Sequence, residues 1–140
     1  MALEYTNTEL LLDGYCENIE AGFHVEHFSD YDYVVTPFDD FVGDNIVLFV
    51  QELGNNEIEI YEDGMIDDLF MMIPVETEQQ ANFYNRLIMQ IGYAFGVDIS
   101  KKFVHVTGQL ENFERLFNQV LQATIAVKNL FYLAEPESSE

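Results

Sequence analysis

Residues 46–62, IVLFVQELGNNEIEIYE, decide the fold because they carry the pattern of two strands joined by a turn. The first strand is predicted from the apolar run Ile46–Val50, whose residues favour strands. The GNN tripeptide at 54–56 is typical of a turn. From residue 57 apolar and polar residues alternate, so one face receives Ile58 and Ile60 and the other receives Glu57, Glu59 and Tyr61. The stretch therefore predicts a β-hairpin.

Four helices are predicted from apolar residues at helical spacing. The first covers about residues 7–20 and follows a T-x-x-E capping-box pattern. A short one covers residues 65–70, and a third begins at a second capping-box pattern, residues 77–80, and ends at Gly96. The last helix covers about residues 110–133.

Two further strands complete the predicted sheet. Alternating side chains indicate a strand at 31–35, which we expect Pro37 to break, and another at 103–107. The order α-β-β-β-α-α-β-α predicts an α+β fold, with helices packed on a small, mostly antiparallel sheet of three to four strands. We expect a single α+β domain over residues 1–135 and a flexible acidic tail over 136–140.

Charge is distributed very unevenly along the 140 residues. Residues 1–85 contain 20 acids and neither lysine nor arginine, whereas residues 86–140 hold all five bases and six acids. The first part therefore carries −20 of the total net charge of −21. Such a field attracts basic partners and repels nucleic acid and acidic lipid. We expect a basic protein partner and no direct binding to nucleic acid or membranes.

The remaining composition favours a cytoplasmic protein. The single cysteine, Cys16, cannot form an internal disulfide, which fits a reducing compartment. The N-terminal residues lack the basic and apolar regions of a signal peptide. The longest candidate for a membrane span, Val120–Ala134, is too short and too polar to cross a bilayer.

The acidic residues and histidines lack the partners or the spacing that catalytic and metal-binding motifs require. A nuclease site needs a lysine beside its acids, yet none precedes Lys101, and residues 39–45 lack the ligand spacing of an EF-hand. His24 and His27 lie three residues apart, so on a strand they point to opposite faces. No P-loop, dinucleotide-binding glycine pattern or nucleophile elbow is present. We expect a protein that is not an enzyme, with neither cofactor nor metal.

Three stretches resemble a known family. They are EIYEDGMIDDL (59–69), LIMQIGYAFGV (87–97) and LFNQVLQATIAVKNLFYLAE (116–135). Together they resemble an uncharacterised bacterial and phage family, number 1828 among the domains of unknown function, over roughly residues 10–135. The resemblance implies a related fold and a bacterial host cell. Because the family has no established activity, it implies no function.

The charge pattern leads to a hypothesis about function. Acids two residues apart on a strand lie about 6.7 Å apart on one face, so rows of them can imitate a phosphate track. We therefore expect a nucleic-acid mimic that binds the basic channel of a nuclease, as an anti-CRISPR or anti-restriction protein. The alternative is a regulatory or antitoxin-like protein-interaction module without mimicry, whose acidity keeps it soluble. The expected contact residues are Asp30, Tyr31, Asp32, Asp39, Asp40, Asp44, Glu57, Glu59, Tyr61, Glu62 and Asp63.

Overall fold

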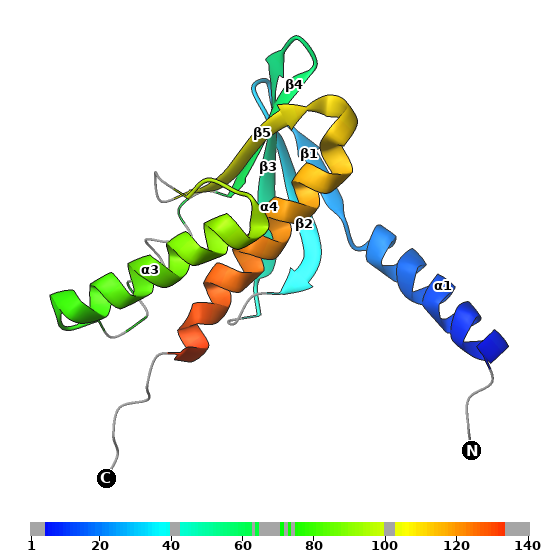
Figure 1. Cartoon of the computed structure of the whole chain (residues 1–140). Coiled ribbons are helices and arrows are strands. Elements are labelled where there is room, and N and C mark those ends of the chain that lie inside the picture. The colour runs from blue at the N-terminus through cyan, green and yellow to red at the C-terminus, as the bar shows by residue number, and fades with distance from the viewer. Residues whose placement is uncertain are drawn as a thin grey trace.

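The structure, a computed structural model, is an α+β fold built on one antiparallel sheet (Figure 1). It describes residues 5–39, 43–62, 64, 71, 73, 75–99 and 103–133. The five strands lie in sequence order: β1 (His24–His27), β2 (Asp32–Asp39), β3 (Asn45–Gly54), β4 (Glu57–Glu62) and β5 (Val104–Gln109). The helices are α1 (Tyr5–Ala21), α3 (Glu78–Phe95) and α4 (Phe113–Lys128), the last flanked by the 3-10 turns η1 (Leu110–Asn112) and η2 (Asn129–Leu133).

The predicted hairpin is confirmed as β3 and β4. Asn55 and Asn56 connect them with φ angles of 54° and 61°, values that asparagine tolerates better than most residues. Along β4, Ile58 and Ile60 are buried, whereas Glu57, Glu59 and Tyr61 are half-buried. The two faces therefore separate as their alternation predicts.

The size of the sheet and the end of one strand differ from the prediction. The sheet has five strands, not three to four, because β1 pairs with β2 along a short exposed edge. Pro37 does not end its strand, since β2 continues to Asp39 across a shift of register between Val35 and Asp39. Proline is tolerated at such irregularities because a ladder hydrogen bond is already missing there. Beside it, the Thr36 hydroxyl donates a 2.8 Å hydrogen bond to the Ile46 carbonyl.

The order of helices and strands agrees with the predicted order, with β1 as the added strand. Helix α3 begins with the expected capping box. The Thr77 hydroxyl accepts a hydrogen bond from the backbone N–H of Gln80, and the side-chain oxygen of Gln80 accepts one from the backbone N–H of Thr77. It ends at Gly96, which has a left-handed φ of 70°. The short helix predicted over 65–70 and the tail predicted over 136–140 lie outside the described residues.

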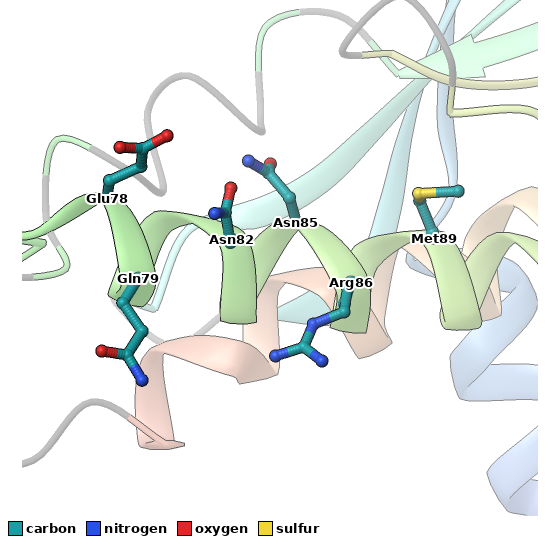
Figure 2. A pocket seen from close by; sticks show the side chains of 6 residues that line it. All are labelled: Glu78, Gln79, Asn82, Asn85, Arg86 and Met89. Atoms are coloured by element: carbon teal, nitrogen blue, oxygen red, sulfur yellow. The ribbon is translucent and has the colours of Figure 1, made fainter.

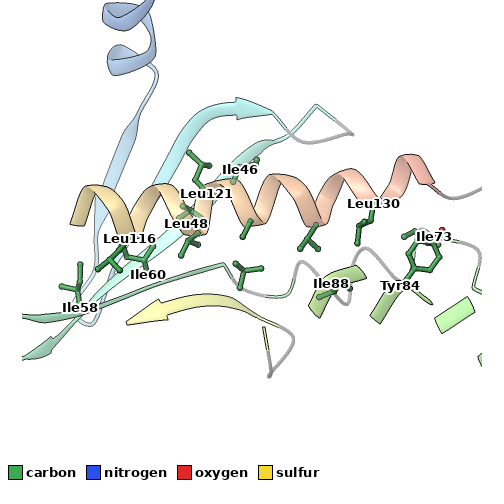
Figure 3. Packing of buried hydrophobic residues seen from close by; sticks show 14 residues of the cluster. Ile46, Leu48, Ile58, Ile60, Ile73, Tyr84, Ile88, Leu116, Leu121 and Leu130 are labelled. Atoms are coloured by element: carbon green, nitrogen blue, oxygen red, sulfur yellow. The ribbon is translucent and has the colours of Figure 1, made fainter. Parts of the chain in front are cut away.

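The core lies between one face of the sheet and α4 (Figure 3). Ile46, Leu48, Ile58 and Ile60 point from the sheet toward this helix, and each is at most 1% exposed. Buried residues of α4 fill the other side of the layer, and α3 packs against α4. The helical residues of the core are Tyr84, Ile88, Leu116, Val120, Leu121, Ala123 and Val127.

Helix α1 projects away from the sheet and the other helices (Figure 1). Its predicted apolar face is exposed, with Leu11 at 60% and Tyr15 at 58%. The helix is attached through Phe23, whose ring centroid lies 6.3 Å from that of Phe38 and 6.2 Å from that of Phe117. Among the helices of the described segments, none combines the length and apolar composition that a membrane span requires.

Candidate protein-binding face

A row of side chains crosses the whole sheet on the face opposite α4. The register pairs Glu26 with Tyr33, Tyr33 with Phe49, Phe49 with Tyr61, and Tyr61 with His105. An isolated bridge then pairs His105 with Asp98. Residues directly opposite each other on antiparallel strands project to the same face, so these six side chains form one line, which we call the cross-strand row. Its members are Glu26, Tyr33, Phe49, Tyr61, His105 and Asp98.

Phe49 is the centre of an aromatic cluster on this face. Its ring stacks on Tyr61 at a centroid distance of 5.2 Å and an interplanar angle of 13°. Tyr33 and Tyr31 each approach Phe49 edge-on, with centroids 5.5 Å away. Tyr31 also stacks on Phe28 at 5.2 Å. Phe28 is 50% exposed and the other four rings are half-buried, so the cluster presents ring surface to solvent.

Carboxylates lie at both ends of the cross-strand row. At one end the His105 ring stands between two acids, with Nδ1 3.3 Å from Glu59 Oε2 and Nε2 3.4 Å from Asp98 Oδ2. At the other end Glu26 Oε1 lies 3.4 Å from His24 Nε2, and its side chain is 52% exposed. The Glu59 and Asp98 side chains are 29% and 55% exposed. The aromatic surface is therefore bordered by accessible negative charge.

The structure brings some of the expected contact residues together on this face. Glu57, Glu59 and Tyr61 share it along β4, and Tyr31 belongs to the aromatic cluster. Asp30 lies in the connection between β1 and β2. This connection and the β3–β4 turn lie at the same end of the sheet, because β2 and β3 are antiparallel. Glu57, Glu59, Tyr61 and Tyr31 are therefore the expected contact residues that the fold holds on this face, and Asp30 lies at the same end of the sheet.

Other expected contact residues lie elsewhere. Glu62 is 8% exposed on the core face with Ile58 and Ile60, so it cannot be an exposed contact carboxylate. Asp32 pairs with Val50, which projects to the core face, and its Oδ1 lies 2.7 Å from His27 Nδ1. Asp39 and Asp44 lie toward the opposite end of the sheet, at the connection between β2 and β3. Asp40 and Asp63 lie outside the described residues.

Sequence reasoning missed several residues of the face: Glu26, Phe28, Tyr33, Phe49, Asp98 and His105. Alternation alone could have shown that Tyr33 and Phe49 project to the other face of the sheet from the buried Val34 and Leu48. Their proximity to Tyr61 and His105 depends on the register between strands, which no local pattern specifies. The face was therefore predicted as a row of acids, whereas its centre is aromatic.

A shallow depression lies along α3. It encloses about 660 Å³ and is lined by side chains that all project from this one helix: Glu78, Gln79, Asn82, Asn85, Arg86 and Met89 (Figure 2). These residues include one carboxylate, Glu78, and one guanidinium, Arg86, and no serine, cysteine or histidine. Within the described ranges, His, Cys, Asp and Glu form no group of three that could hold a metal ion.

Comparison with known proteins adds no relative to this description. No family model matches the chain, and neither a curated protein nor a solved structure is significantly similar to it. The resemblance to the uncharacterised family 1828 therefore stays a prediction from the sequence.

Proposed function

We propose that this protein is a non-enzymatic inhibitor that imitates nucleic acid and occupies the basic channel of a nuclease, in the manner of anti-CRISPR and anti-restriction proteins. The observation that carries the proposal is the separation of charge between two sides of the fold. The five strands and α1 contain no lysine or arginine. The bases within the described segments, Arg86, Arg115 and Lys128, lie on α3 and α4, in the layer that covers the opposite face.

The sheet face opposite α4, which carries the cross-strand row, is called the open face. Its carboxylates suit this role. Glu57 and Glu59 lie two residues apart on β4, so their side chains project from one face at intervals of about 6.7 Å. A negatively charged rigid surface increases the rate at which a basic channel is encountered, and the rate falls as salt rises. The same field repels nucleic acid, so the protein competes with the nucleic acid of its target instead of binding it.

Competition for a nuclease tests the mechanism. The purified protein is titrated into a complex of a restriction or guide-RNA nuclease with a fluorescent DNA duplex, and displacement is measured by anisotropy. We expect Glu57→Gln combined with Glu59→Gln to weaken displacement about three- to tenfold, since each lost contact is worth about 0.7 kcal/mol.

The matched control places the same charge change on the other side of the fold. Glu111 and Glu114 are both exposed, in η1 and at the start of α4. Glu111→Gln combined with Glu114→Gln should leave displacement nearly unchanged. Equal losses in the two double variants would mean that net charge acts without a specific face, and the mimic mechanism would then be wrong.

The aromatic cluster favours a second candidate, a regulatory or antitoxin-like protein-interaction module without mimicry. Aromatic residues are enriched at the centres of protein interfaces, whereas imitation of phosphates requires only carboxylates. Recovery of a direct partner that has no basic nucleic-acid channel, and whose binding is lost in Phe49→Leu, would support this candidate over the first.

A further inference from the structure

We infer that the open face selects arginine side chains on a basic partner, in preference to lysine, by stacking them on the aromatic cluster between the carboxylates of the cross-strand row. This inference rests on the proposed function only in requiring a basic protein partner. It adds which basic side chain is recognised and which residues recognise it.

The rings are placed to receive a planar cation. Tyr33 meets Phe49 at an interplanar angle of 75°, so one ring of this pair keeps both its faces uncovered by the other. Phe49 and Tyr61 stack nearly parallel, so each ring covers one face of the other and keeps its outer face. Ring faces carry negative quadrupole potential and attract cations within about 6 Å. We place the guanidinium on a ring face that no neighbouring ring of these pairs covers.

The carboxylates lie where a stacked guanidinium needs acceptors. Glu26 is the direct cross-strand neighbour of Tyr33, so their Cβ atoms lie about 5 Å apart. Glu59 projects from the same face as Tyr61, two residues away along β4, at about 6.7 Å. A guanidinium on either tyrosine ring can therefore donate to a carboxylate at that end of the row.

Arginine fits this combination better than lysine does. The guanidinium is planar, weakly hydrated and able to donate two parallel hydrogen bonds to one carboxylate, whereas the ammonium is a strongly hydrated point charge. Nucleic-acid bases also stack on aromatic residues, but their phosphates are repelled by a chain of net charge −21. Charge complementarity thus selects a basic protein segment as the occupant.

Two peptides of equal length, oligo-arginine and oligo-lysine, measure the preference directly. Each carries fluorescein, and its affinity for the full chain is measured by anisotropy at about 0.15 M sodium chloride, where the Debye length is about 8 Å. We expect oligo-arginine to bind about two- to fivefold more tightly than oligo-lysine, the ratio that corresponds to an advantage of about 0.5 to 1 kcal/mol for the stacked guanidinium. Tyr33→Leu combined with Tyr61→Leu removes both tyrosine rings, so it should bring this ratio close to one while the affinity for oligo-lysine changes little.

Matched variants keep the result interpretable. Tyr93 is 82% exposed on α3, so Tyr93→Leu removes a ring elsewhere and should preserve the ratio. If the double variant fails to fold by circular dichroism, Tyr31→Leu tests the same cluster at the end of the sheet and should lower the ratio. Glu59→Gln should weaken binding of both peptides.

The same assay distinguishes a failure of arginine selection from a failure of the proposed function. Tight, salt-sensitive binding of both peptides without a preference would overturn arginine selection and leave the acidic inhibitor standing. Binding of neither peptide would remove the basic partner on which both depend. Binding of a DNA duplex, or a dimer in light scattering that Phe49→Leu disrupts, would assign the face to another occupant and overturn the inference.

Discussion

Replacing Ile60 with alanine should destabilise the protein strongly, whereas replacing its neighbour Glu59 with glutamine should hardly affect stability. Ile60 is 0% exposed and lies beneath α4, while the Glu59 side chain is 29% exposed on the open face. The comparison tests the register of β4 because a slip of one residue would exchange the two faces. The placement of Glu57, Glu59 and Tyr61 on one surface depends on that register.

The size of the effect follows from the atoms removed. Ile60→Ala deletes three buried carbon atoms, which at about 0.8 kcal/mol each gives about 2.4 kcal/mol of lost transfer free energy. A residual cavity of about 40 Å³ adds about 1 kcal/mol at about 24 cal/mol per Å³. We therefore expect a loss of about 3 to 4 kcal/mol, and a loss of about 1 kcal/mol for the smaller change Ile60→Val. Glu59→Gln should stay within about 0.5 kcal/mol, the usual range for surface substitutions.

Urea denaturation followed by circular dichroism measures these differences. With a slope of about 2 kcal/mol per molar, Ile60→Ala should lower the midpoint by about 1.5 to 2 M relative to the unchanged protein. A loss below about 1 kcal/mol for Ile60→Ala, or a larger loss for Glu59→Gln than for Ile60→Ala, would contradict this expectation. Either result would mean that the two faces of β4 are assigned incorrectly.

Four further predictions concern helix ends, α1 and charge. Thr77→Ala should cost about 1 kcal/mol in urea denaturation, because it removes the hydroxyl that accepts from the first turn of α3. Gly96→Ala should cost about 1 kcal/mol in the same measurement, since its φ of 70° is unfavourable for residues with a Cβ atom; no loss would show that this end of the helix rearranges. Leu11→Ser combined with Tyr15→Ser should change the free energy of unfolding by less than about 0.5 kcal/mol, because both side chains are exposed; a loss above about 2 kcal/mol would place α1 against the core. Calorimetry should show the melting temperature rising between low and moderate sodium chloride, since salt screens self-repulsion at net charge −21, and a flat or falling value would contradict this expectation.

Features that depend on nearby residues were predictable from the sequence. The capping box of α3 requires only Thr77 and Gln80, three positions apart, and its end requires a residue such as Gly96 that accepts a left-handed φ. The β3–β4 hairpin was equally local, because alternation and a GNN turn specify it. These elements agree with the structure because local hydrogen bonds and periodicity act within a few residues.

Features that depend on pairing between segments were missed. The HVEH sequence of β1 shows no apolar alternation, all four residues are exposed, and it becomes a strand only by pairing with β2. Pro37 was expected to end β2, yet the shift of register around it lets the strand continue to Asp39. Glu62 was missed for another reason: it was counted as a contact residue because it is acidic, although its local alternation with Ile60 places it on the core face.

The sequence is sufficient for the sign of the charge along the first 85 residues and for the alternation within β4. Its base-free first 85 residues and the period-two pattern at 57–62 are properties of the chain, whatever it packs against. Tertiary structure alone decided that Tyr33, Phe49 and Tyr61 become neighbours, with carboxylates at both ends of their row. Spacing along one strand follows from covalent geometry, whereas neighbours across strands depend on the hydrogen-bonded register of the whole sheet.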